Sequence, residues 1–225
     1  ESNVIEGVPE GSMEFGIAHA ELNPQQTFIL KSDSTYEPPR EASIAAMVGG
    51  SNRSPESWLY DYLVADQSNM VIMFFTNYSD FNLDAVYEMQ MDPATVTGLS
   101  DAGAHVSLIF DAVNPTYQLT YWTRDRERGK TLPLSQVIHR ATRKNAQLFG
   151  FHDRGLIDVG MKADLNVIDY RNLKLGELHI KEDLPAGGIR LMQGASGYLA
   201  TIINGAVTRR FDQDTGVRPG RLIRS

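Results

Sequence analysis

The run Met70-Val71-Ile72-Met73-Phe74-Phe75 decides the fold class of this 225-residue chain. Uninterrupted apolar residues between polar flanks are typical of a strand that is covered on both faces, as the strands of a parallel sheet are. Helices are expected on either side of this strand. Ser54-Pro55 supplies an N-cap and a first-turn proline, and Asp80 to Met91 has apolar residues at helical spacing. A covered strand between two helices predicts an α/β fold.

The alternation of strands and helices continues in both directions from this run. Towards the N-terminus we expect a short strand at Thr27 to Leu30 and a short helix at Arg40 to Val48. Towards the C-terminus the β-prone segment Thr95 to Leu99 precedes two helices, at 117–128 and 134–149. The aromatic residues of the first of these helices lie at helical spacing and are expected in the core: Tyr117, Tyr121 and Trp122.

The pattern of predicted secondary structure changes between residues 150 and 155. Beyond this point short β-type runs alternate with glycine and proline, at Asp164 to Tyr170, at Tyr198 to Ile203 and at Ala206 to Phe211. The last two runs flank Asn204-Gly205, which is a typical hairpin turn. We therefore expect an α/β domain over residues 1–150 and a β domain over residues 151–225.

Composition excludes several classes of function. A net charge of -7 and a pI near 5.2 disfavour binding to nucleic acid. The basic cluster at 124–130 is interleaved with acidic residues and is interpreted as a solvated helix end. The chain has no cysteine, and no run approaches the roughly 18 apolar residues of a membrane span. We therefore expect a cytoplasmic protein that does not bind a membrane.

Asp101 is the first candidate for a catalytic residue, because it follows the predicted strand at 95–99 in a polar loop. Enzymes of the α/β class place their chemistry at such strand ends, where a carboxylate can hold a metal ion or transfer a proton. The alternative is an ordinary turn or helix cap, since Ser-Asp-x-Gly is also a turn sequence. His105 could ligate a metal or bind a substrate carboxylate, or it could be a surface residue. The remaining histidines form no His-x-His or His-x-x-x-His pattern.

Several motifs together resemble the N-acyl-D-amino-acid deacylase branch of the metal-dependent amidohydrolase superfamily. The segments that carry the resemblance, which runs from about Tyr36 to the C-terminus, are Gly98 to His105, Pro115 to Tyr117, Ala141 to Gly150, Asp153 to Ile157, Gly160 to Asp169, Leu184 to Gly188 and Thr215 to Arg221. The combination is far more specific than any single motif.

The resemblance implies a partial TIM-like (β/α) barrel over residues 1–150, consisting of its last strand-helix units, followed by strands of a small β-sandwich over 151–225. It assigns Asp101 as the catalytic and metal-binding residue and His105 as a substrate-binding residue. Ala102 departs from the pattern, since a glycine is common there. Zinc is the implied cofactor, supplied mainly by ligands absent from this chain, because the His-x-His of the family is missing and the chain matches the family only after the sixth barrel strand.

The expected function is hydrolysis of the amide C–N bond of a small N-acyl-D-amino acid. One alternative is another amidohydrolase substrate, such as a cyclic amide or a dipeptide. Another is a non-catalytic fragment or partner subunit that completes a barrel with a second chain. The expected protein partner is accordingly either another copy in an oligomer or an N-terminal companion segment.

Overall fold

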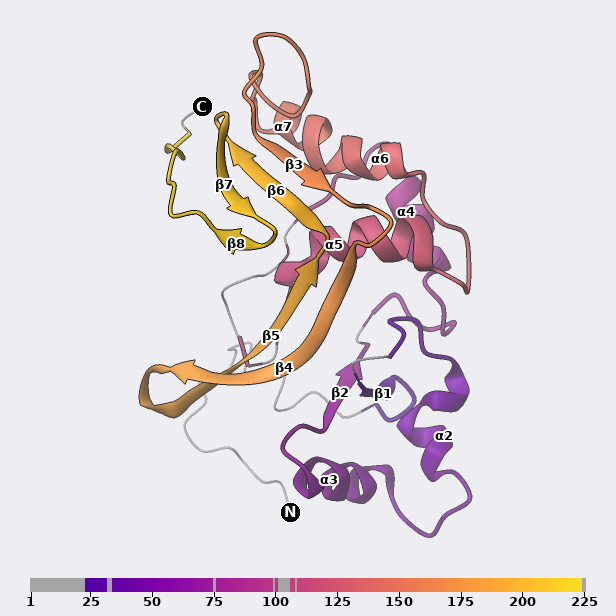
Figure 1. The fold of residues 1–225 in the computed structure, drawn as a ribbon. Helices are drawn as coiled ribbons and strands as arrows, with labels where there is room; N and C mark the ends of the chain where they lie inside the picture. The colour runs from indigo at the N-terminus through magenta and orange to yellow at the C-terminus, as the bar shows by residue number, and fades with distance from the viewer. Residues whose placement is uncertain are drawn as a thin grey trace. The chain divides into compact units, whose positions relative to one another are not determined.

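The computed structural model describes residues 23–31, 34–74, 76–98, 100, 106–107 and 109–223. The chain divides into two compact units, Glu1–Phe81 and Asn82–Ser225 (Figure 1). The described elements of the first unit are β1 (Thr27–Leu30), the short 3-10 helix η1 (Arg40–Ala42), α2 (Ile44–Val48), α3 (Pro55–Ala65) and β2 (Met70–Met73).

The first unit is built around the antiparallel pair of β1 and β2, in which Thr27 lies opposite Met73. The strand predicted from the apolar run at residue 70 is therefore confirmed, but its parallel pairing is wrong. All four residues of β2 are only half-buried, so the expected cover on both faces is not present in the described residues. An apolar run predicts that a strand is buried, but it does not predict whether the partner strand is parallel or antiparallel.

The core of the first unit is aromatic. The ring of Phe28, which is fully buried, makes edge contacts with Phe74, Tyr78 and Phe81 at centroid distances of 5.8 to 6.4 Å. Tyr78 stacks on Phe74 at 4.0 Å, and its hydroxyl donates a hydrogen bond to the Pro38 carbonyl at 2.6 Å. The predicted helix start at Ser54 is confirmed, since its hydroxyl accepts from the backbone of Ser57 at 3.2 Å.

The second unit begins with helices. They are α4 (Asp84–Met91), η2 (Asp111–Val113), α5 (Asn114–Thr120) with its π-helical continuation η3 (Tyr121–Asp125), and a second run of α6 (Leu134–His139), the π-helix η4 (Arg140–Lys144) and α7 (Asn145–Leu148). The predicted helices at 117–128 and 134–149 are confirmed with small shifts at their ends. Trp122, Leu132 and Val137 form the buried core, which confirms the expected burial of the Trp122 ring.

The interpretation of the basic cluster at 124–130 as a solvated helix end is confirmed for Arg128 and Lys130, which are exposed, but it is wrong for Arg126. The Arg126 side chain is fully buried, lies over the Trp122 ring at 5.0 Å, and donates to the Lys130 carbonyl and to Asp84 at 2.8 Å each. Arg124 donates to the Leu173 carbonyl at 2.8 Å. Alternating charges describe the average solvation of a segment, but individual arginines can turn inwards when backbone carbonyls are within reach.

Strands dominate the second unit after residue 164. β3 (Leu165–Ile168), β6 (Tyr198–Ile203), β7 (Ala206–Arg210) and β8 (Gln213–Asp214) form an antiparallel sheet in the order β3-β6-β7-β8. The predicted turn at Asn204-Gly205 is confirmed, with φ values of 49° and 79°. The sequence had predicted β3, β6 and β7 within a few residues of these bounds.

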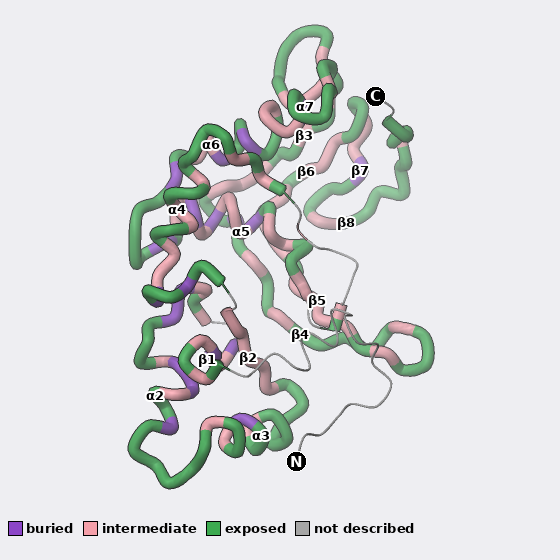
Figure 2. Tube along the Cα trace, turned by 180° about the vertical axis from the view of Figure 1, so that it is seen from behind, coloured by how far each residue is buried: buried purple, intermediate pink, exposed green. Residues whose placement is uncertain are grey.

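A long curved hairpin lies in the chain between β3 and β6, which are neighbours in this sheet (Figure 1). It consists of β4 (Lys174–Leu184), the short turn η5 (Pro185–Gly187) and β5 (Gly188–Ser196). None of its strand residues is buried, as Figure 2 shows. The sequence pattern does not predict this hairpin, because charged residues interrupt the apolar alternation and because Ala186 occupies a positive φ of 60° where glycine is usual.

The described part of the chain is thus a mixture of helices and antiparallel strand pairs, and it contains no closed barrel. The partial barrel, the sandwich and the domain boundary at residue 150 stay predictions. None of the described helices is long and apolar enough to cross a membrane.

Candidate active site

The segment that leads towards Asp101 is irregular between Thr95 and Gly98, so the strand predicted there is wrong over these described residues. Its carbonyls accept hydrogen bonds from side chains and not from a described neighbouring strand. The Lys144 ammonium donates to the carbonyls of Pro93 and Thr95, the latter at 2.6 Å, and the Asn145 amide donates to Thr97 at 2.9 Å. The helical run that contains Lys144 and Asn145 therefore holds the Thr95–Gly98 segment through side-chain hydrogen bonds. The sequence of the segment does not predict these bonds.

Arg140 makes the third contact between the same helical run and the segment. Its Nη2 donates to the Thr95 hydroxyl at 2.7 Å, and the residue is 7% exposed. Burial lowers the pKa of the Arg140 guanidinium from its ordinary value, although an arginine remains charged at neutral pH. Two buried polar atoms here have no hydrogen-bond partner among the residues that the structure describes: Nε of Arg140 and Oδ1 of Asn145.

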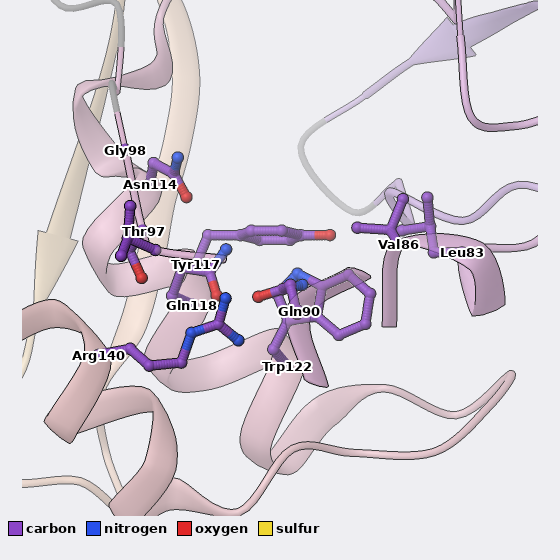
Figure 3. A pocket seen from close by; sticks show the side chains of 11 residues that line it. Leu83, Val86, Gln90, Thr97, Gly98, Asn114, Tyr117, Gln118, Trp122 and Arg140 are labelled. Carbon is purple, nitrogen blue, oxygen red and sulfur yellow. The ribbon is translucent and has the colours of Figure 1, made fainter. Parts of the chain in front are cut away.

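A pocket of about 400 Å³ opens beside this guanidinium (Figure 3). Its apolar wall comes mainly from α4 and from the aromatic rings of α5 and η3, and its polar residues are three neutral amides, the hydroxyl-bearing Thr97 and Tyr117, and Arg140. The lining residues are Leu83, Val86, Gln90, Val96, Thr97, Gly98, Asn114, Tyr117, Gln118, Trp122 and Arg140. The volume lies within the range of roughly 300–1,000 Å³ that is usual for small-molecule sites.

Both π-helical segments contribute to this pocket. The backbone N–H of Arg126 bonds to the Tyr121 carbonyl at 2.9 Å, and this widened turn contains Trp122. The other π-helix, η4, begins at Arg140. Widened turns of this kind are frequent at functional sites, because they rotate single side chains out of the regular helical pattern.

Described residues that precede and follow the motif from Ser100 to His105 are held by hydrogen bonds. Upstream, Asn145 holds the Thr97 carbonyl, as described above. Downstream, the backbone N–H of Leu191 in β5 donates to the Val106 carbonyl at 2.8 Å. The hairpin that sequence analysis missed thus fixes the residue directly after the motif.

The two site residues predicted from the sequence, Asp101 and His105, lie outside the described residues. The described histidines, His139, His152 and His179, are all exposed. Within the described ranges no three His, Cys, Asp or Glu side chains lie close enough together to hold a metal ion. The described residues therefore do not by themselves fit a zinc site, and no geometry for a metal follows from them.

Comparison with known proteins gives the class of the chain. The family model described as "Amidohydrolase family" matches residues 43–209, and the chain belongs to this family. It is accordingly a hydrolase of a superfamily that is generally metal-dependent. No curated protein sequence and no solved structure matches the chain.

Sequence analysis did not identify Arg140 or the amides around it. A signal was present, because Arg140 lies three residues after the buried Val137 and four before Lys144, on one helix face. A charged residue on the buried stripe of a helix needs a polar partner or a ligand. Lys144 and Asn145 were part of the quoted family motif, but their role as anchors of the Thr95–Gly98 segment follows only from the structure.

Proposed function

We propose that this chain contributes to a metal-dependent hydrolase that cleaves the amide C–N bond of N-acyl-D-amino acids, with Asp101 as its proton-transfer residue. The observation that carries the proposal is the pocket whose lining ends at Thr97 and Gly98, directly before the motif that contains Asp101. The membership of the chain in the amidohydrolase family supports the reaction class.

The chemistry requires a proton to travel from water to the leaving nitrogen. Water attacks the amide carbonyl, a C–O bond forms, and the C–N bond breaks to release a carboxylate and an amine. The Asp101 carboxylate would accept the proton of the attacking water and deliver it to the amine nitrogen. We propose zinc as the metal of the family reaction; when bound, it would supply Lewis-acid polarisation of the carbonyl. Its ligands would lie mainly outside this chain.

His105 is proposed as a substrate-binding residue, because it follows Asp101 by four positions in the same motif. An imidazole N–H can donate a hydrogen bond to the acyl oxygen or to the carboxylate of such a substrate. An oligomer or an N-terminal companion segment would complete the barrel, and a cytoplasmic location agrees with the absence of cysteine.

Replacing Asp101 by Asn tests the catalytic assignment. Asn keeps the size of the side chain but cannot accept and return the proton, so turnover of N-acetyl-D-leucine by the intact enzyme should fall about 10²- to 10⁴-fold. Release of free leucine measures this. Asp158→Asn is the matched control, because the exposed Asp158 accepts only from the adjacent Val159 N–H, and it should leave turnover unchanged. Near-normal turnover by Asp101→Asn would refute the assignment.

The same assay separates the proposed substrate from its rivals. N-acyl-D-amino acids, N-acyl-L-amino acids, a cyclic amide and a dipeptide are compared by kcat/KM. Preference for a cyclic amide or a dipeptide would agree with the assignment as a hydrolase but would contradict the assignment as an N-acyl-D-amino-acid deacylase.

A further inference from the structure

The Arg140 guanidinium is a buried cation with no described anion. Its Nη2 is held by the Thr95 hydroxyl at 2.7 Å, its Nε has no partner, and none of the ion pairs between described residues includes it. Arginine is almost never buried unless it is paired, because leaving water costs a charged group several kcal/mol. Among the described residues, the site therefore lacks a negative group of matching size.

The space for such a group lies beside the guanidinium. Figure 3 shows the Arg140 side chain extending towards the amides of Gln118 and Gln90, and all three line the same pocket. An amide can donate to an anion through its nitrogen. Asn114 adds a further amide to the lining, so neutral donors are available around a single positive charge.

The charge and the walls of the pocket define the ligand. One guanidinium surrounded by neutral groups matches a singly charged anion better than a phosphate, and the planar guanidinium favours a carboxylate. The opposite wall is apolar, with Leu83, Val86 and the Trp122 ring. A small carboxylic acid that bears an aliphatic group satisfies both sides.

We infer that this pocket binds the carboxylate of a small aliphatic acid through Arg140, and that this acid is the amino-acid part of the substrate. The second half of the statement rests on the proposed function, whereas the carboxylate site does not. Arg140 thereby becomes the ionic anchor of the substrate. Its planar guanidinium can donate hydrogen bonds to the carboxylate oxygens.

Calorimetry on the intact protein tests the carboxylate site without any turnover. Isovalerate and its neutral analogue isovaleramide have nearly the same shape, so their difference in Kd reports recognition of charge. We expect isovalerate to bind about 10-fold or more tightly than isovaleramide, because a hydrogen bond to a charged group has about that effect. In Arg140→Gln the preference should disappear. Arg221→Gln, which removes an exposed arginine, should keep it.

One further variant keeps the result interpretable. If Arg140→Gln fails to fold, Val86→Trp leaves Arg140 in place and fills the apolar side of the pocket, so the folded variant should lose both ligands. Equal binding of acid and amide to the unaltered protein would overturn the site. A folded Arg140→Gln that retains the preference, or a folded Val86→Trp that binds isovalerate as before, would overturn it equally.

Kinetics separates this inference from the proposed function. With N-acetyl-D-leucine as substrate, Arg140→Gln should raise KM about 10-fold with a smaller change in kcat, because the contact is made in the ground state as well as in the transition state. If the unaltered enzyme does not hydrolyse N-acetyl-D-leucine but binds isovalerate through Arg140, the proposed function fails and the carboxylate site stands. If hydrolysis occurs and Arg140→Gln leaves KM unchanged, the role of Arg140 in the substrate site fails.

Discussion

Arg126 and Arg140 are both buried arginines of the second unit, but their surroundings differ. Arg126 has a carboxylate, a backbone carbonyl and an aromatic face around it, whereas Arg140 has a single described hydroxyl partner. Gly129 also makes room for Arg126, because a Cβ there would lie 2.4 Å from its Cζ. The first arginine is thus part of the packing, and the second borders a pocket.

Replacing Arg126 by Met should lower the free energy of unfolding by about 2 kcal/mol, because the variant loses charge-assisted hydrogen bonds in a buried position. The partner substitution Asp84→Asn should lower it by less than about 1 kcal/mol, since the Asp84 side chain is 61% exposed and solvent weakens its pairing with Arg126. Urea unfolding of both variants measures the difference. An equal loss for the two would mean that the ion pair, and not the buried carbonyl and ring contacts, holds Arg126.

At the scale of elements, the helical run from α6 to α7 makes contacts with two other parts of the chain. One face carries the side chains that hold the Thr95–Gly98 segment, and its C-terminal end packs against the following loop. Gly155 of this loop has a φ of 83°, and a Cβ there would lie 2.9 Å from both Ala146 Cβ and Arg143 Cα. The loop therefore approaches the helix too closely for any side chain at this position.

Gly155→Ala and Gly160→Ala form a matched pair that tests this packing. Both glycines have positive φ, at 83° and 88°, but a Cβ at Gly160 meets no atom within 4 Å. Each substitution should lose roughly 1–2 kcal/mol from backbone strain. Gly155→Ala should lose about 1–3 kcal/mol more, because it also forces the loop and helix apart. Equal unfolding free energies in urea would contradict the close approach.

At the scale of the whole chain, the two units have separate cores. The first unit is held by the aromatic cluster around Phe28 and the second by the cluster around Trp122. The candidate pocket and the anchors of the Asp101 motif all come from the second unit. The described residues of neither unit provide a group of metal ligands.

The zinc content of the purified chain tests whether a companion is required. Because a tetrahedral catalytic zinc usually takes three protein ligands, and the described residues bring no such group together, we expect well below one zinc per chain after dialysis. Elemental analysis by plasma mass spectrometry measures this. Stoichiometric zinc together with turnover by the chain alone would contradict the companion proposal.

Local features of this protein were determined by the sequence itself. The cap at Ser54, the turn at Asn204-Gly205 and the helices around Trp122 depend on contacts within a few residues, so propensity and spacing were sufficient to predict them. The resemblance to amidohydrolases could also be recognised from the sequence, because the motif residues and their order along the chain are properties of the sequence.

The pairing of distant segments was decided only by the tertiary structure. The antiparallel partner of β2, the β4–β5 hairpin and the bond between Arg140 and Thr95, which are 45 positions apart, each depend on where other parts of the chain lie. The free energy of such contacts comes from burial and from the satisfaction of polar groups by remote residues, and no local pattern encodes it. For this reason Asp101 could be proposed from the sequence alone, whereas Arg140 and its pocket required the fold.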